Sequence, residues 1–216
     1  MEGVTKRLDG FTDAAFAFAL TLLVIGRGDV PTDFAELRSA MAEVPAFAIG
    51  FAIIAMFWFT HVRWRRYRGH GDARSVLLTF ILIFLVLIYV RPLQAVALSL
   101  SAHLGAEVGA FKGGIGQLFA VYGAGFVAMA ATLTALFADA RRNPDLDALD
   151  RNALRGEIII WSILTLTGVL SLVLALFGAT ERWSPLPYAT LPFTIGLFVW
   201  RFEWDPKPLA EAEERA

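Results

Sequence analysis

The N-terminal segment places charged side chains directly before and inside an apolar run. It opens with Lys6, Arg7 and Asp9, continues to Asp13, and is then apolar as far as Ile25. Ionisable groups within a membrane span are costly and often functional. Asp13, about one helical turn inside the apolar run, is therefore a candidate for an ion path or a structural switch. The alternative is a carboxylate that fixes packing by pairing with Arg7 or with another helix.

A second polar group ends the next apolar segment. Trp58 and His61 are three residues apart, so they share one face of a helix. His61 lies near the expected membrane edge and can be interpreted in two ways. It is either a packing histidine or a titratable partner of Asp13.

The apolar run after Asp13 carries a regular stripe. Phe18, Leu22 and Ile25 follow the helical i, i+4, i+7 spacing and share one face, with Thr21 beside them. This periodicity alone favours a helix-packing surface over a pore lining.

Other chemistry finds little support in the residues. The chain has no cysteine, and its histidines, His61, His70 and His103, are scattered over a span end and two loops. Serine-hydrolase, zinc-protease and phosphate-loop motifs are missing from the sequence. We therefore expect no enzyme, no metal site and no cofactor. A net charge of −1 gives no dominant basic face, which argues against nucleic acid as a partner.

The elements that position these residues follow from composition. Of the 216 residues, 57% are hydrophobic and 18% charged, too apolar for a soluble domain. Apolar stretches long enough to span a bilayer predict six transmembrane segments. They must be helices, because backbone groups in lipid are satisfied internally. We therefore predict an all-α, polytopic membrane protein with spans near 11–25, 45–62, 76–90, 115–138, 158–177 and 186–200.

A cleaved signal peptide is the rival interpretation of the first segment. It fits poorly, because the segment lacks a small-residue cleavage site and contains Asp13. Between the first two spans, Asp33 and Glu36 predict a short outer helix that reaches Arg38.

Charge distribution predicts the orientation. With six spans, 14 of the 19 Lys and Arg residues fall on the side of the N-terminus. Because cytoplasmic loops carry the excess of Lys and Arg, both termini are expected in the cytoplasm. Residues 1–204 then form a single six-helix transmembrane domain, and residues 205–216 form a charged cytoplasmic tail.

Two motifs carry a resemblance to a known family. The opening Arg7-x-x-x-Phe11-Thr12-Asp13, followed by a small and apolar run into Thr21-Leu22-Leu23-Val24, resembles the first-helix signature of the endosomal/lysosomal potassium channel family, transmembrane protein 175. Trp58-x-x-His61 is similar to the second-helix motif of that family. Six spans and about 200 residues match its prokaryotic members.

The resemblance implies a homotetrameric channel in the lipid bilayer of the bacterial plasma membrane, passing potassium and other monovalent cations. The first helix of each subunit would line the pore, without a separate selectivity-filter loop. Phe18, Leu22 and Ile25 would form the constriction, with Thr21 as the nearby polar group. The residues expected to tie the helices together are Arg7, Phe11, Thr12, Asp13, Trp58 and His61.

The sequence departs from the family pattern at several positions. Thr12 replaces the usual serine and Phe18 an isoleucine, Val62 stands where a second histidine is usual, and Arg91 precedes a proline where an apolar residue is usual. An asparagine expected in the third helix is missing near Ile81.

Two other functions compete with a channel. The first is a small ion-coupled secondary transporter that uses Asp13 as its coupling carboxylate. The sequence lacks the paired broken helices that such transporters place in two matching halves. The second is a membrane structural or assembly protein without a transport role.

Overall fold

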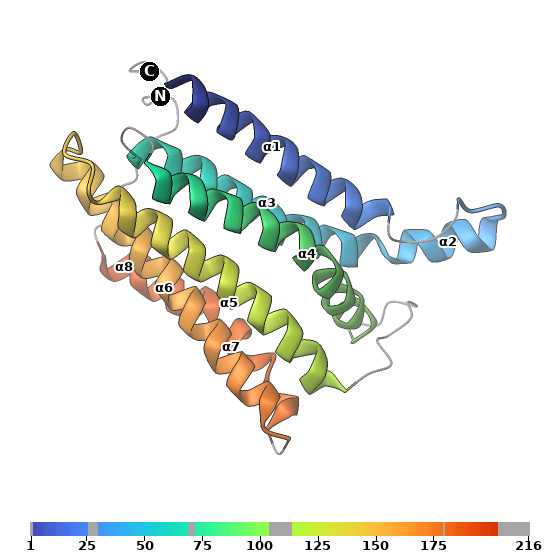
Figure 1. The fold of residues 1–216 in the computed structure, drawn as a ribbon. Helices are drawn as coiled ribbons and strands as arrows, with labels where there is room; N and C mark the ends of the chain where they lie inside the picture. Colours follow the sequence, from blue (N-terminus) through green and yellow to red (C-terminus); the bar gives the residue numbers. More distant parts are fainter. Residues whose placement is uncertain (1, 26–29, 69–71, 104–113, 179, 203–216) are drawn as a thin grey trace.

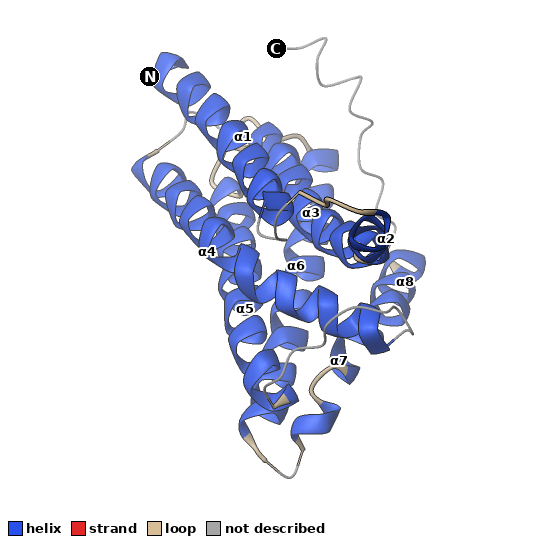
Figure 2. Ribbon diagram, turned by 90° about the vertical axis from the view of Figure 1, so that its right-hand side faces the viewer, coloured by secondary structure: helices blue, strands red, loops and turns tan. Residues whose placement is uncertain are grey.

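The computed structural model describes residues 2–25, 30–68, 72–103, 114–178 and 180–202. These residues form helices joined by turns, and no strand occurs among them (Figure 2). The elements are α1 (Glu2–Ile25), α2 (Phe34–Ala42), α3 (Val44–Tyr67), α4 (Ala73–His103), α5 (Ile115–Ala140), α6 (Ala148–Leu176), η1 (Glu181–Trp183), α7 (Leu186–Ala189) and α8 (Leu191–Arg201).

Each of the six predicted spans corresponds to a helix or a helix pair. The helix for the third span, α4, continues beyond position 90 to His103 with Pro92 inside it. The sixth span is divided into α7 and α8, and both short helices begin at a proline-containing turn, around Pro187 and Pro192. Proline is tolerated in the first turn of a helix but interrupts a helix interior, which explains the division.

Four of the described ranges are long and apolar enough to cross a membrane, as in the all-α membrane fold predicted above. They are Phe34–Tyr67, Ala73–Leu100, Ile115–Ala140 and Ala148–Leu176. Two of the six predicted spans are not among these ranges: α1, with 24 residues, and the pair α7–α8, in which α8 has 11.

The helices pack side by side, with α1 at one edge of the bundle (Figure 1). α1 packs mainly against α3 and α4, α4 packs against α5, and α5 packs most extensively against α6. The short α7 and α8 contact α6. The largest fully buried side chains come from α1, α3, α4, α5 and α6, so one apolar core joins these helices.

Carboxylate side chains begin several helices. Asp33 accepts a hydrogen bond from the Glu36 backbone N–H at 2.8 Å and so caps α2, which confirms the predicted short helix after Asp33. Asp72 precedes α4 and accepts bonds from the hydroxyl and the backbone N–H of Ser75 at 2.6 and 2.8 Å. Both bonds hold the pKa of Asp72 below its usual value, and the bond from the Ser75 hydroxyl has the larger effect.

A glycine allows close contact between α4 and α5. A Cβ built on Gly125 would lie 2.5 Å from the ring of Tyr89, which is itself buried. A ring enclosed in the core has little room to move. The missing side chain of Gly125 therefore makes this helix contact possible.

We predict that Gly125→Ala lowers the free energy of unfolding by about 1–3 kcal/mol, because the added methyl group overpacks the core. The measurement is thermal unfolding of the detergent-solubilised protein. Gly196→Ala is the control, since a Cβ at this helical position meets no atom within 4 Å. Equal melting temperatures for the two variants would contradict the close contact.

Candidate functional site on helix α1

Helix α1 has two different faces. Its buried face follows helical spacing and packs into the core through Leu8, Thr12, Phe16, Ala19 and Leu23. The opposite face is exposed and includes Phe11, Ala14, Phe18 and Thr21. The neighbouring helices of the chain therefore cover one face of α1 and leave a largely apolar stripe uncovered.

The four predicted pore residues differ in how far the structure describes and exposes their side chains. Phe18 is 56% exposed. Thr21 is also exposed, and its hydroxyl donates a hydrogen bond to the Ala17 carbonyl at 2.9 Å. Leu22 is half-buried and packs against the core. Ile25 is the last residue of α1, and its side chain lies outside the described residues.

Charged residues near the N-terminal end of α1 pair with the C-terminal end of α3. Arg68 binds the Asp9 carboxylate with both terminal nitrogens, at 2.9 and 2.7 Å. Arg65 binds Asp13 and also lies 3.6 Å from Asp9. Two carboxylates thus meet two guanidinium groups in a partly buried, neutral cluster. Such bidentate, charge-assisted bonds are among the strongest in proteins.

Asp13 has a second partner on α3. The indole N–H of Trp58 donates a hydrogen bond to its carboxylate at 3.0 Å. Of the two interpretations of Asp13, the structure shows the pairing with another helix, and Trp58 and Arg65 are the partners. The Asp13 side chain remains 44% exposed, so solvent weakens the pair.

His61 connects α3 to α4. Its Nε2 atom lies 3.3 Å from the Thr79 hydroxyl, and both residues are buried. On the other side of the ring, Nδ1 accepts a bond from Arg65 Nε at 3.5 Å. The guanidinium of Arg65 therefore contacts both His61 and Asp13, and it connects the two side chains that were predicted as partners.

The remaining motif residues contribute in separate ways. The ring of Phe11 lies 5.9 Å from that of Phe80 on α4. The buried Thr12 hydroxyl donates to the Leu8 carbonyl at 2.8 Å and so bonds within its own helix. Arg7 is exposed. Of this group, Phe11 makes an aromatic contact with another helix.

Sequence reasoning missed the basic half of the cluster. Arg65, Arg68 and Asp9 are not among the residues that the sequence predicts to tie the helices together. Their spacing carried a usable signal, because Asp9 and Asp13 are four apart while Arg65 and Arg68 lie on the helix face of Trp58 and His61. An acidic face and a basic face on successive helices indicate a pair.

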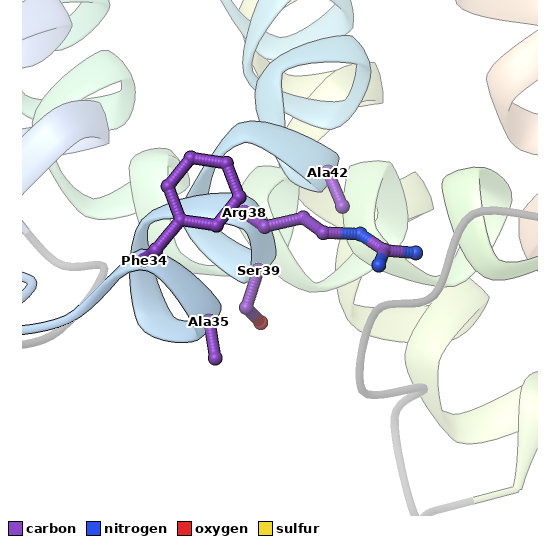
Figure 3. A pocket seen from close by; sticks show the side chains of 5 residues that line it. All are labelled: Phe34, Ala35, Arg38, Ser39 and Ala42. Atoms are coloured by element: carbon purple, nitrogen blue, oxygen red, sulfur yellow. The ribbon is translucent and has the colours of Figure 1, made fainter.

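Other features lie outside this cluster. Arg63 binds the buried Glu157 at 2.9 Å and ties α3 to α6. A groove on α2 is lined by Phe34, Ala35, Arg38, Ser39 and Ala42 (Figure 3). All five residues belong to one helix, and within the described part of the chain no second element lines this groove. Within the described residues, no group of three or more His, Cys, Asp or Glu side chains could hold a metal.

Comparisons with known proteins point to one family. The family model described as "Endosomal/lysosomal potassium channel TMEM175" matches residues 7–90, which contain the whole cluster of α1 and α3. A protein of Marivirga tractuosa named "Potassium channel" is 39% identical over 103 residues. That alignment covers 48% of this chain and 41% of the relative, so it spans less than half of the relative's length.

The likeness to a solved structure extends further along the chain. A variant of the potassium channel MtTMEM175, crystallised with a nanobody–MBP fusion protein, matches with a TM-score of 0.78. The two sequences are 26% identical, and the match covers 89% of this chain and 90% of the other. The fold similarity therefore includes the helices beyond residue 90.

We predict that Asp13→Asn lowers the free energy of unfolding by about 1–2 kcal/mol, because it removes the charge opposite Arg65 in a partly buried pair. The measurement is thermal unfolding in detergent. Asp139→Asn is the matched control, because Asp139 pairs with the exposed Arg142 within one helix end. That change should cost less than about 0.5 kcal/mol. Equal losses in both variants would contradict a special role for the Asp13 pair.

Proposed function

Because the chain belongs to the endosomal/lysosomal potassium channel family, TMEM175, we propose that it is a potassium-permeable cation channel of the bacterial plasma membrane. The observation that carries the proposal is the two-faced α1, with one face packed in the subunit and one apolar stripe uncovered. The family match over residues 7–90 and the relatives named as potassium channels support it.

The proposed channel is a homotetramer. One helix cannot enclose a pore, so several copies of α1 must surround a common axis. The exposed stripe of α1 supplies a surface that would meet symmetry copies of itself. In this arrangement, the uncovered side chain of Phe18 would face the common axis.

The constriction is proposed to consist of Phe18, Leu22 and Ile25, with Thr21 as its polar group. An apolar ring resists wetting, so a cation loses hydration there without receiving ligands in return. Potassium sheds its water more easily than sodium, and a modest preference for potassium follows. The Thr21 hydroxyl donates to Ala17 and keeps its oxygen lone pairs for a passing ion. Other monovalent cations would pass with lower preference.

The cluster at the opposite end of α1 has a structural role in this proposal. Asp13 is held by Arg65 and Trp58, which makes it a fixed anchor of the pore helix. A coupling carboxylate of a secondary transporter must instead exchange its ion or proton during each cycle. The pairing of Asp13 therefore favours the channel over the transporter.

Orientation and domain limits follow the sequence argument. We propose that both termini are cytoplasmic, that residues 1–204 form one transmembrane domain, and that residues 205–216 form its tail. Helix α2 would then stand on the outer side of the membrane, since it follows the first span.

We predict that Phe18→Asn raises conductance and lowers the potassium-to-sodium permeability ratio, because a polar ring wets the constriction. Leu22→Asn and Ile25→Asn, tested singly, should act in the same direction. The measurement is planar-bilayer recording of the reconstituted protein under bi-ionic conditions. A gain of about tenfold in conductance corresponds to about 1.4 kcal/mol off the permeation barrier.

Phe193→Asn is the matched control for this series. Phe193 is exposed on α8, which packs against α6 and α7, and the same substitution there should leave permeation unchanged. If all three α1 variants keep wild-type conductance and selectivity, the stripe does not line a pore and the assignment is wrong.

We also predict that Phe18→Cys forms inter-subunit cross-links up to a tetramer. The natural chain contains no cysteine, so the introduced thiol is unique in each subunit. A four-armed maleimide reagent, which can join up to four thiols, is applied to the membrane-embedded protein, and denaturing electrophoresis gives the result. Phe193→Cys should yield fewer products, because α8 lies away from the proposed axis. A cross-link-free protein that still conducts would exclude the tetrameric arrangement.

A further inference from the structure

The C-terminal end of α1 is bonded to α4 by a buried glutamine. The side-chain amide of Gln94 donates to the Leu23 carbonyl at 2.9 Å and lies 3.4 Å from the Leu22 carbonyl. Gln94 belongs to the second half of α4, two residues after Pro92. The contact is therefore far along the helix from the cluster of Asp9 and Asp13.

These two carbonyl groups belong to the last turn of α1. Carbonyls at the C-terminal end of a helix carry the negative end of its dipole, and each oxygen has two lone pairs, so it can accept a bond from outside the helix. Gln94 supplies a donor from a neighbouring helix. A buried amide without partners would be costly, so both sides of the contact depend on it.

Arg91 supports the glutamine from the other side. Its Nη1 atom lies 3.5 Å from the Gln94 Oε1 atom, one helical turn earlier in α4. The guanidinium thus orients the amide so that its N–H group faces α1. Its positive charge also lies near the negative end of the α1 dipole.

Close packing seats the same turn against α3. The Leu23 side chain is fully buried and occupies the space that a side chain on Gly50 would fill, with Leu23 Cδ2 3.1 Å from a Cβ built there. The last turn of α1 is therefore held by an apolar contact to α3 and a polar contact to α4.

We propose that Gln94 is a positioning residue that fixes the C-terminal turn of α1, with Arg91 supporting it, and thereby sets how far the stripe from Phe18 to Ile25 projects. The inference rests on the proposed channel function. Without the bond, the turn can shift toward the axis, where apolar side chains would contact their symmetry copies and close the pore.

The test compares Gln94→Met with Gln117→Leu in single-channel recordings. Methionine keeps the length and volume of glutamine but has no donor. Gln117 is exposed on α5, so its replacement makes the same kind of change away from α1. We expect the ratio of open to closed time to fall about fivefold in Gln94→Met, as for the loss of one hydrogen bond. Gln117→Leu should keep the wild-type ratio.

A second measurement does not depend on conduction. Hydrogen exchange of the backbone amides at residues 21–25 should become faster in Gln94→Met and, to a smaller extent, in Arg91→Gln. Arg91→Gln removes the charge and leaves the Gln94 amide in place. If Gln94→Met does not assemble, Arg91→Gln is the deciding variant. Hydrogen exchange at the wild-type rate in Arg91→Gln would then overturn the proposal.

The outcomes separate this inference from the proposed function. Gln94→Met channels with an unchanged or raised ratio of open to closed time would overturn the positioning role. If Phe18→Asn still alters permeation in the same preparation, the channel function stands without it. A wild-type protein that passes no current in the bilayer contradicts the channel function, and hydrogen exchange at residues 21–25 then decides whether Gln94 holds the C-terminal turn of α1.

Discussion

The requirement that carboxylates at a membrane edge be neutralised dominates the organisation of this protein. Asp9 and Asp13 lie on the helix that also carries the exposed stripe with Phe18, and an unpaired charge there would be costly. Arg68 and Arg65 of α3 meet them in a cluster that Trp58 completes. Because the bonds are directional and charge-assisted, they fix the rotation of α1 about its own axis as well as its place. That rotation determines which residues remain uncovered.

The two ends of α1 are held by different chemistry. Ion pairs to α3 hold the N-terminal half, and an uncharged amide from α4 holds the C-terminal turn. An amide suits the second position, since its N–H group donates directly to a backbone carbonyl of α1. Between the two ends, contact with the core is apolar through Phe16, Ala19 and Leu23. A helix held at both ends presents its free face in one defined orientation.

The arrangement of helices explains why one edge of the bundle carries the candidate function. The contacts between α5 and α6 are the most extensive in the structure, and α7 and α8 extend this half. It forms the packed support of the fold, and Gly125 lets Tyr89 of α4 approach α5 closely. α1 lies at the opposite edge of the bundle and packs mainly against α3 and α4 (Figure 1). Most of one face of α1 therefore remains uncovered. An exposed apolar face of this kind is suited to contact with further copies or with lipid.

The sequence determined the helical class, the approximate spans and the family resemblance, because these depend on local hydropathy, proline positions and short motifs. It also identified Asp13, Trp58 and Phe11 as residues that contact another helix. The partners Arg65 and Gln94 needed the tertiary structure, since each contact joins positions more than 50 residues apart whose pairing depends on helix rotation. Leu22 and Phe18 illustrate the same limit. They share one stripe by periodicity, yet packing against the core half-covers Leu22 and leaves Phe18 exposed, a difference that only neighbouring helices create.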